Sequence, residues 1–155
     1  MIRAANSQDL KTIQQFGYQL LEYEHDNWDP TLELDWPFSE AGEAAYAKAI
    51  SEKCTLIAEA DNKAIGFLIG SVKRPAPGAA RSIISAQLEN IFVDDEMRGH
   101  GIGEKLAHEF KKYCLKEKAD AINVTVNAKN KQATRFYEKV GFLPSRIFLS
   151  QELKK

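Results

Sequence analysis

The chain contains little cysteine and no long apolar run. Cys54 and Cys114 are the only cysteines among its 155 residues, and neither belongs to a metal-binding or redox spacing. Both lie in apolar-patterned segments, so we expect two reduced cysteines in the core. No apolar stretch approaches the ~18 residues that cross a membrane, and the polar start MIRAANSQDL is unlike a signal peptide. These absences predict a cytoplasmic protein without a membrane partner.

An excess of charge of either sign is also missing. Lys and Arg number 21 and Asp and Glu number 22, for a formal net charge of −1, so we expect no nucleic-acid partner. The apolar content of 44% and the charged content of 28% are ordinary for a soluble globular protein. A chain of this length can form one domain with a real core, and we therefore expect residues 1–155 to be a single domain.

The most informative stretch is LENIFVDDEMRGHGIG, residues 88–103. Residues 88–93 are apolar and partly β-branched, as suits a buried strand, and the acidic residues 94–96 end it. In residues 98–103 glycines alternate with larger residues, which leaves backbone N–H groups uncovered. A helix predicted to follow points the positive end of its dipole at the same place. The stretch therefore predicts an anion site, with a diphosphate as the favoured anion.

Hydrophobic periodicity divides the rest of the chain into short helices and strands. It predicts helices over residues 8–24, 41–51, 101–117 and 130–140, and strands over residues 2–5, 55–59, 64–73, 83–93, 121–126 and 142–149. Ser7 and Ser39 are expected to cap the first two helices, and residues 74–81 form a Pro/Gly loop. The order β-α-α-β-β-β-α-β-α-β predicts an α/β fold with a mixed sheet, antiparallel first and parallel later.

This order and three segments resemble the GNAT superfamily of acetyl-coenzyme-A-dependent N-acetyltransferases. Residues 98–103 match the family's acetyl-CoA loop, R/Q-x-x-G-x-G/A, and the strand before them ends in the family's hydrophobic-valine step. Asn127, Asn130 and then ATRFYEKVGF, residues 133–142, match the late segment N-x-x-N…A-x-x-F-Y-x-x-x-G-F. Any one match is weak, but the three together in this order are specific. The resemblance covers nearly the whole chain and implies the GNAT fold, whose mixed sheet splays to hold acetyl-CoA.

The resemblance also implies where acetyl-CoA binds, and it calls for no metal. The cofactor would lie between the two parallel strands that end near Val93 and Val126, with its pantetheine arm paired to strand backbone as an added half-strand. The diphosphate would sit on N–H groups of residues 99–104. The expected cofactor-binding residues are Ile91, Phe92, Val93, Arg98, Gly99, His100, Gly101, Ile102, Gly103, Glu104, Asn130 and Ala133.

Acetyl transfer to an amine needs a neutral nitrogen and a proton for the departing thiolate. A primary ammonium has a pKa near ~10, so a base or a water chain must remove its proton. Tyr137 matches the family's frequent thiolate-protonating tyrosine, although its apolar helix face also suits a core residue. Glu89 stands where family members use a glutamate to contact the amine or act as base. Its apolar neighbours suggest a buried carboxylate, and the alternative is a solvated strand residue.

The acceptor is predicted from residues 22–43, which hold eight carboxylates and one side chain that can become a cation, His25. An acidic wall favours a small cationic amine such as a polyamine, while the alternative is that the carboxylates only solubilise a loop. LLEYEHD also looks like the acceptor-side segment of diamine acetyltransferases, which implies that Tyr23 and Glu24 contact the substrate. The two tryptophans of this region, Trp28 and Trp36, either line that pocket or pack the loop.

Other acceptors and another class of function stay open at this point. A protein N-terminus or lysine, an amino acid and an aminoglycoside are alternative acceptors. A non-catalytic acyl-CoA-binding module is the alternative of another class, which the presence of both Glu89 and Tyr137 disfavours. Homodimers are common in the family, so a homodimer is expected by analogy alone.

Overall fold

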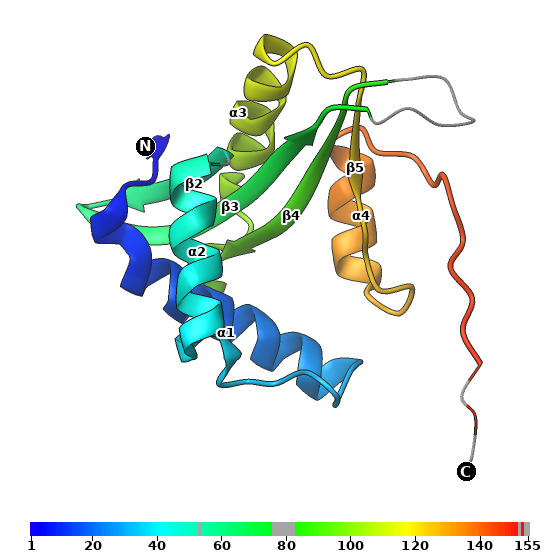
Figure 1. Cartoon of the computed structure of the whole chain (residues 1–155), viewed down its shortest axis with the longest axis horizontal. Coiled ribbons are helices and arrows are strands. Elements are labelled where there is room, and N and C mark those ends of the chain that lie inside the picture. Colours follow the sequence, from blue (N-terminus) through cyan, green and yellow to red (C-terminus); the bar gives the residue numbers. More distant parts are fainter. Residues whose placement is uncertain (53, 76–82, 152, 154–155) are drawn as a thin grey trace.

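The computed structural model describes residues 1–52, 54–75, 83–151 and 153. In these residues a five-stranded sheet is combined with four α-helices (Figure 1). The elements are β1 Ile2–Ala4, α1 Leu10–Asn27, α2 Glu40–Glu52, β2 Cys54–Ala60, β3 Lys63–Lys73, β4 Ser85–Val93, α3 Ile102–Lys116, β5 Ala121–Val124 and α4 Lys131–Lys139. Most of the loop predicted at 74–81 lies outside the described residues. No helix in the described part of the chain is long and apolar enough to cross a membrane.

The sheet is mixed, as its sequence order predicts. The strands lie in the order β1-β2-β3-β4-β5, where β1 to β4 pair antiparallel and β4 pairs with β5 in parallel. Asp61 and Asn62 form the tight turn between β2 and β3 with φ of 49° and 60°, a backbone geometry that suits a two-residue hairpin. A parallel pair needs a long crossover, and α3 supplies it between β4 and β5.

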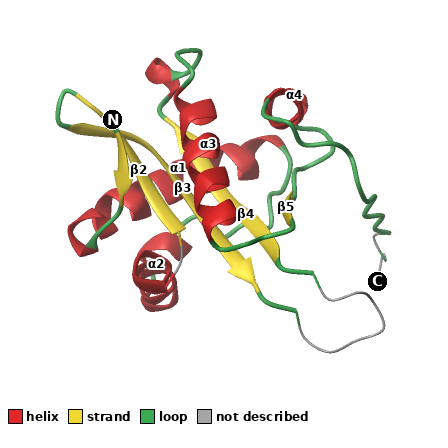
Figure 2. Cartoon of the chain, turned by 90° about the horizontal axis from the view of Figure 1, so that it is seen from above, coloured by secondary structure: helices red, strands yellow, loops and turns green. Residues whose placement is uncertain are grey.

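Helices cover both faces of the sheet (Figure 2). On one face α3 packs with Leu106, Phe110 and Cys114 buried, as its helical period predicts. On the other face α1 and α2 enclose a second buried cluster, in which the Phe16 ring stacks on Phe67 at 5.9 Å. Burial of apolar side chains on both faces stabilises a sheet of this kind. Both cysteines of the chain are free and buried, as expected.

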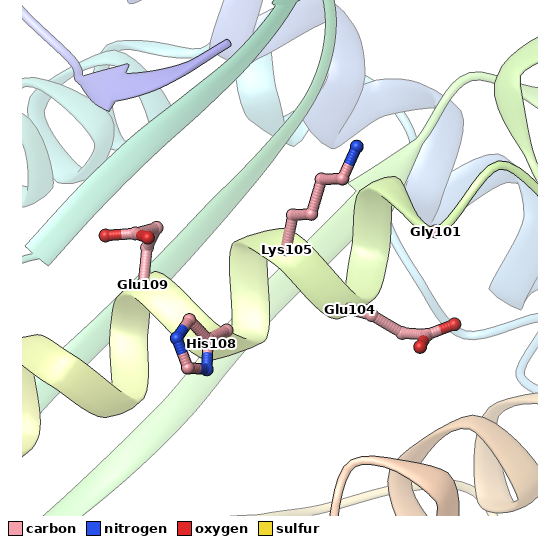
Figure 3. A pocket seen from close by; sticks show the side chains of 5 residues that line it. All are labelled: Gly101, Glu104, Lys105, His108 and Glu109. Carbon is pink, nitrogen blue, oxygen red and sulfur yellow. The ribbon is translucent and has the colours of Figure 1, made fainter.

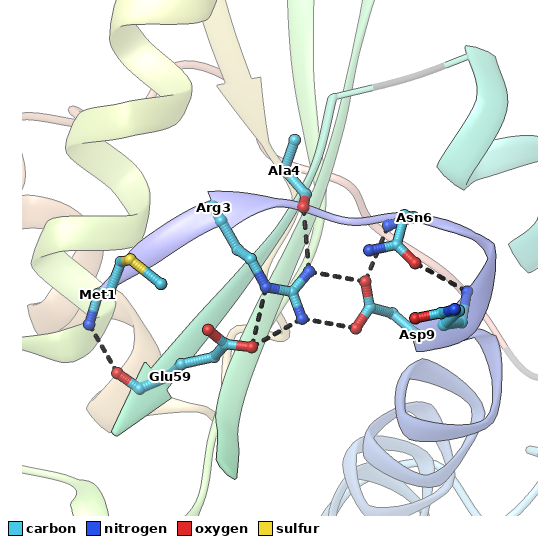
Figure 4. A network of polar contacts seen from close by, with 7 residues as sticks. Met1, Arg3, Ala4, Asn6, Asp9 and Glu59 are labelled. Carbon is cyan, nitrogen blue, oxygen red and sulfur yellow. Dashed lines mark hydrogen bonds and ion pairs between the residues drawn. The ribbon is translucent and has the colours of Figure 1, made fainter. Parts of the chain in front are cut away.

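The start of the chain is fastened to the sheet edge by a polar network (Figure 4). The Arg3 guanidinium makes two 2.7 Å hydrogen bonds to the Asp9 carboxylate and an ion pair with Glu59 at 2.7 Å. Asn6 caps the turn that precedes α1, and Asp9 accepts a hydrogen bond from the Asn6 backbone N–H at 2.8 Å. The prediction that Ser7 caps the first helix is therefore wrong, because Asn6 and Asp9 already form a capping box. Ser39 does cap α2, by accepting from the Gly42 N–H at 3.1 Å.

One predicted strand is absent. Residues 142–149 are all described, and none of them belongs to a strand. No strand in the described part of the chain pairs with this segment, and Pro144 lacks the N–H that a ladder would use. A strand is stabilised only when a neighbour accepts its hydrogen bonds, so the β-like pattern of this segment is not sufficient.

Candidate active site

The two parallel strands part at the centre of the sheet. Their pairing runs from Ser85 opposite Ala121 to Leu88 opposite Val124, and β4 then continues alone beside β3 to Val93. The register between β3 and β4 shifts at this level, so Leu88 and Asn90 have β3 partners while Glu89 falls between them. A bulge of this kind bends a strand. The splayed sheet expected from the resemblance is therefore present.

A cavity of about 370 Å³ occupies the opening between the strands. It is lined by residues 89–93 of β4, by residues 125–127 that follow β5, by the glycine-rich loop with the start of α3, and by α4. Three residues of α1 close it from the side. Most of the cofactor-binding and catalytic residues expected from the sequence meet here: Glu89, Ile91, Phe92, Val93, Arg98, Gly99, Gly101, Ile102, Gly103, Glu104, Asn130, Ala133 and Tyr137. His100 is exposed and is not among the lining residues.

The glycine-rich loop leaves the beginning of α3 open. Gly99 and Gly101 have φ of +80° and +73°, and a Cβ added at either position would meet no atom within 4 Å. Gly101 is the N-cap of α3 and offers no side chain to its first-turn N–H groups. The His100 ring turns back to the loop, with Nδ1 3.0 Å from the Arg98 carbonyl oxygen. The first turn therefore presents unfilled N–H donors and the positive end of the helix dipole, as an anion requires.

Gly103 differs from Gly99 and Gly101 because it lies at a contact between two helices. It lies inside α3, and a Cβ at this position would come 3.1 Å from the Phe136 ring. The absence of a side chain lets α4 pack closely against α3. The sequence predicted that all three glycines uncover N–H groups. In the structure Gly99 and Gly101 do so, whereas Gly103 allows close packing of two helices.

Arg98 ties the loop to the strand and to α1. Its Nε donates to the Val93 carbonyl oxygen at 3.0 Å, and its guanidinium pairs with Asp95 at 2.6 Å. The guanidinium carbon also lies 5.8 Å from the centre of the Tyr23 ring and 5.7 Å from that of Phe92. These contacts are of the cation–π type. Arg98 therefore holds the glycine-rich loop and α1 in a fixed relation.

Tyr137 enters the cavity from α4. Its ring makes edge contacts with Phe136 at 5.2 Å and with Phe142 at 5.6 Å, which set the position of the phenol. Burial, and after it the Glu24 carboxylate, raise the pKa of Tyr137 to about 12. Desolvation and a negative neighbour both disfavour a phenolate. The group is therefore a phenol, able to donate a proton, at neutral pH.

Glu24 and Tyr23 lie in the last turns of α1, which continues to Asn27 and so extends beyond its predicted end. Both line the cavity. Burial and then Asp29 raise the pKa of the Glu24 carboxyl. Tyr23 makes an edge contact with Trp28 at 5.1 Å, and Trp36 makes one with Tyr46 at 5.7 Å. Neither tryptophan is a lining residue, so both serve packing.

The acidic stretch reaches the cavity through one residue. Of the eight carboxylates in residues 22–43, Glu24 alone is among the described lining residues. The negative charge of Asp29 contributes to the raised pKa of Glu24. The expectation of a wall of carboxylates was therefore too broad. Sequence composition could not distinguish them, since the direction of each side chain depends on where α1 ends.

Glu89 is not the buried carboxylate that its apolar neighbours suggested. It is exposed at the bulge of β4, and its Oε1 accepts a hydrogen bond from the Ser71 hydroxyl at 2.6 Å. The bulge turns its side chain away from the core, which removes the expected desolvation. Its position among the lining residues still gives it access to the cavity.

Two contacts between lining residues of the cavity could not be derived from the sequence patterns. The Lys139 ammonium of α4 lies 2.6 Å from the Glu104 carboxylate in the first turn of α3. The Asn130 side chain caps α4 through its oxygen, which accepts from the Ala133 N–H at 2.9 Å, so its amide group is left to donate. The cavity is also lined by residues outside the set that was expected to bind or catalyse: Leu20, Asn90, Met97, Thr125, Val126, Asn127, Gln132, Phe136 and Lys139.

A second hollow, of about 420 Å³, runs along α3 beside Gly101. The side chains of Glu104, Lys105, His108 and Glu109 leave the helix in different directions around it (Figure 3). Because these groups do not converge on a common point, the hollow is an open helix surface rather than a reaction site. The expected catalytic residues, Glu89 and Tyr137, lie instead in the cavity between the strands.

Comparisons with known proteins agree with this geometry. The sequence profile of the acetyltransferase (GNAT) family matches residues 17–142. A curated relative, an uncharacterized N-acetyltransferase of Methanocaldococcus jannaschii, is 30% identical over 86 residues, which make up 56% of this chain. The match spans only 37% of that relative's own length.

Solved structures share the fold at lower identity. A tetramutant of the BH1408 protein of Bacillus halodurans superposes with a TM-score of 0.89 at 20% identity, over 99% of both chains. The aminoglycoside N-acetyltransferase AAC(6')-Iy, solved with a bisubstrate analog of CoA, has a TM-score of 0.76 at 20% identity, over 99% of this chain and 98% of that one. The family profile covers well over half of the sequence, and the fold agrees with it, so this chain belongs to the GNAT family of acetyltransferases.

Proposed function

We propose that the chain transfers an acetyl group from acetyl-CoA to a primary amine, and that the acceptor is a small cationic amine such as a polyamine. The observation that carries this proposal is the convergence of an open glycine-rich loop, a half-buried phenol that stays protonated and a carboxylate on one cavity. Transfer is direct within a ternary complex, since neither cysteine is among the residues that line the cavity.

The cavity fits the cofactor that the family uses. Gly99 and Gly101 leave room where any other residue would place a Cβ, and the first turn of α3 has no capping side chain. A diphosphate on the N–H groups of residues 99–104 meets the positive end of α3. The backbone of residues 91–93 no longer pairs with β5 and is available for the pantetheine arm, which Asn130 contacts through its amide group.

Bound acetyl-CoA supplies a thioester for attack, and the residues of this chain supply the proton transfers. Tyr137 donates its phenolic proton to the departing thiolate, a role that requires the phenol to stay protonated at neutral pH. Glu89 takes a proton from the acceptor ammonium, directly or through water, so that the neutral amine can attack the thioester carbonyl; the C–N bond forms and the C–S bond to the leaving thiolate breaks. A backbone N–H of β4 donates to the carbonyl oxygen as negative charge develops there.

The acceptor is proposed from the α1 side of the cavity. Glu24 places a carboxylate where a second positive charge of the acceptor would lie, and Tyr23 presents an aromatic face beside it. A carboxylate attracts a cation more strongly in a half-enclosed site than in open solvent. A diamine satisfies both ends of such a site, since one nitrogen can pair with Glu24 while the other reacts.

An amine panel with acetyl-CoA tests the proposal, with release of free thiol as the readout. Diamines and longer polyamines should react with the highest kcat/KM. An aminoglycoside, an amino acid and a peptide with a free N-terminus or lysine cover the other acceptor classes. Fast release with one of these and none with polyamines would replace the acceptor. CoA binding without thiol release on any amine would favour a non-catalytic acyl-CoA-binding module.

The setting of the enzyme is part of the same proposal. We propose a cytoplasmic homodimer. Two buried cysteines that stay free are in keeping with a reducing compartment.

A further inference from the structure

The second half of α1 lies outside the core. The buried residues of this helix all belong to its first half: Ile13, Gln14, Phe16 and Gly17. Residues 18–27 are half-buried or exposed, and they include Tyr23 and Glu24, which line the cavity. Figure 1 shows α1 extending below the strands of the sheet. A helix end with little buried surface opens locally at a small cost in free energy. Contacts outside the core therefore decide how firmly this half of α1 faces the cavity.

Arg98 makes such a contact from the glycine-rich loop. Its guanidinium carbon lies 5.8 Å from the centre of the Tyr23 ring and 5.7 Å from the centre of the Phe92 ring. Phe92 is a buried residue of β4, and its ring lies 5.4 Å from the Phe16 ring in the core. One planar cation therefore joins the outer half of α1 to a ring that is fixed in the core.

The guanidinium itself is held in place by polar contacts. Its Nε donates to the Val93 carbonyl oxygen at 3.0 Å, and a terminal nitrogen pairs with the Asp95 carboxylate at 2.6 Å. A lysine could not make these contacts together, because its ammonium is a point charge without the planar fork of donors. Two nitrogens of Arg98 are thus engaged by the end of β4 and by the turn after it. A ligand of a diphosphate would instead direct its donors at the anion.

We infer that Arg98 is a positioning residue for the acceptor rather than a ligand of the cofactor's phosphates. By holding the Tyr23 ring, Arg98 fixes the last turns of α1, and with them the Glu24 carboxylate, beside the place where the amine binds. This role rests on the proposed function, in which the acceptor lies on the α1 side of the cavity. It makes the affinity for the amine depend on a residue of the glycine-rich loop.

Glu24 follows Tyr23 because the end of α1 is a rigid turn. The two residues are consecutive, so their side chains leave the helix about 100° apart. The Asn27 side chain donates to the Tyr23 carbonyl oxygen at 2.7 Å, and the Trp28 N–H donates to the Glu24 carbonyl oxygen at 2.9 Å. The Trp28 ring also makes an edge contact with the Tyr23 ring at 5.1 Å. A shift of the Tyr23 ring therefore redirects Glu24.

Amide hydrogen exchange of the free protein tests the positioning role without any reaction. In Arg98→Lys the amides of residues 20–27 should exchange about 3- to 10-fold faster, because a cation–π contact and a hydrogen bond are weakened. The amides of residues 13–17, in the core, should keep their rates. Tyr23→Leu should have the same effect as Arg98→Lys, and Tyr23→Phe, which keeps the ring, a smaller one.

Arg74→Lys is the matched control for hydrogen exchange. Arg74 is exposed and is not among the residues that line the cavity, so the same chemical change at this position should leave residues 20–27 unaffected. Unchanged exchange in both Arg98→Lys and Tyr23→Leu would overturn the inference. An equal acceleration of residues 13–17 would also overturn it, since Arg98 would then stabilise the whole domain instead of one helix end.

Kinetics with the most reactive amine separate the acceptor from the cofactor. Arg98→Met should raise the KM for the amine about 3- to 10-fold, and the dissociation constant for CoA should rise by less. A larger effect on CoA than on the amine would make Arg98 a phosphate ligand and overturn the inference. The double variant Arg98→Met/Tyr23→Leu should resemble the weaker of the two single variants, whereas fully additive effects would show that the residues act separately.

Failure of this inference can be told apart from failure of the proposed function. If no amine reacts, the acetyl-transfer proposal is contradicted. The exchange rates of residues 20–27 still decide in that case whether Arg98 holds Tyr23, because they are measured on the free protein.

Discussion

Tyr137 of α4 and Glu24 of α1 line the same cavity, and burial together with the Glu24 charge raises the pKa of the Tyr137 phenol to about 12. The two helices lie at opposite ends of the chain, and only the fold brings these side chains together. The arrangement keeps the phenol protonated at neutral pH. It also places the Glu24 carboxylate in the cavity where the proposed acceptor would bind.

Tyr137→Phe should lower kcat by about 10²-fold or more, since general acid catalysis typically contributes that much. The affinity for acetyl-CoA should stay nearly unchanged, because the aromatic ring and its packing remain. Steady-state kinetics and calorimetric binding measure the two effects separately. Tyr113→Phe, on α3 and outside the cavity, is the control. An unchanged rate would remove Tyr137 from the mechanism.

Glu24→Gln should raise the KM for a diamine by about 10-fold, because the variant loses one charge pair with the substrate in a partly enclosed site. Because burial and Asp29 raise the pKa of Glu24, its carboxylate is protonated at a higher pH than an exposed one. In the unaltered enzyme kcat/KM for a diamine should therefore fall as the pH decreases through that pKa. The variant should lack this component of the fall.

Glu33→Gln is the control, because it changes an exposed carboxylate of the same acidic region. It should leave the KM for a diamine and the pH dependence of kcat/KM unchanged. If the two variants behave alike, the acceptor is recognised elsewhere. The Glu24 substitution should also lower the pKa of Tyr137, which ultraviolet titration of the phenol can detect.

Glu89→Gln should shift the pH profile of kcat or weaken amine binding, since the variant cannot accept a proton from the substrate. Ser71→Ala removes only the hydrogen bond at 2.6 Å and should have a smaller effect, of a few-fold. Comparison of the two separates the charge of Glu89 from its orientation. If neither the profile nor the amine KM moves in the Glu89 variant, this residue is structural.

Lys139→Met should raise the KM for acetyl-CoA about 3- to 10-fold, because it leaves the Glu104 carboxylate unneutralised beside the diphosphate. Glu104→Gln should have little effect or a favourable one. The double variant should return close to the unaltered KM, and added salt should reduce all the differences. Effects that simply add in the double variant would mean that the pair does not act on the cofactor.

Gly101→Ala should lower the affinity for CoA by about 10-fold. A Cβ at φ of +73° meets no atom but costs the backbone about 1–2 kcal/mol, so the loop should relax away from the conformation that presents its N–H groups. Isothermal titration with CoA gives the affinity. Urea unfolding of the free protein shows how much of the change is lost stability. Full affinity in a folded variant would place the diphosphate elsewhere.

Local patterns in the sequence were enough for most elements of the fold. The apolar period of α3, the strand before the glycine loop and the paired strands after α2 are properties of consecutive residues, so the mixed sheet and the open loop could be predicted. Tyr137 and Glu24 stay predictions as site residues. Each lies in a segment whose spacing matches the family, and each lines the cavity.

Contacts between distant segments could not be derived in this way. The bulge that exposes Glu89, the Lys139–Glu104 pair and the single carboxylate that faces the cavity all depend on how strands and helices from separate segments meet. A strand pattern over residues 142–149 records a preference for extended backbone, but a strand also needs a partner with free hydrogen-bonding groups. Side-chain periodicity is a property of neighbours in sequence, whereas partners, burial and pKa are properties of neighbours in space, and for these the tertiary structure was required.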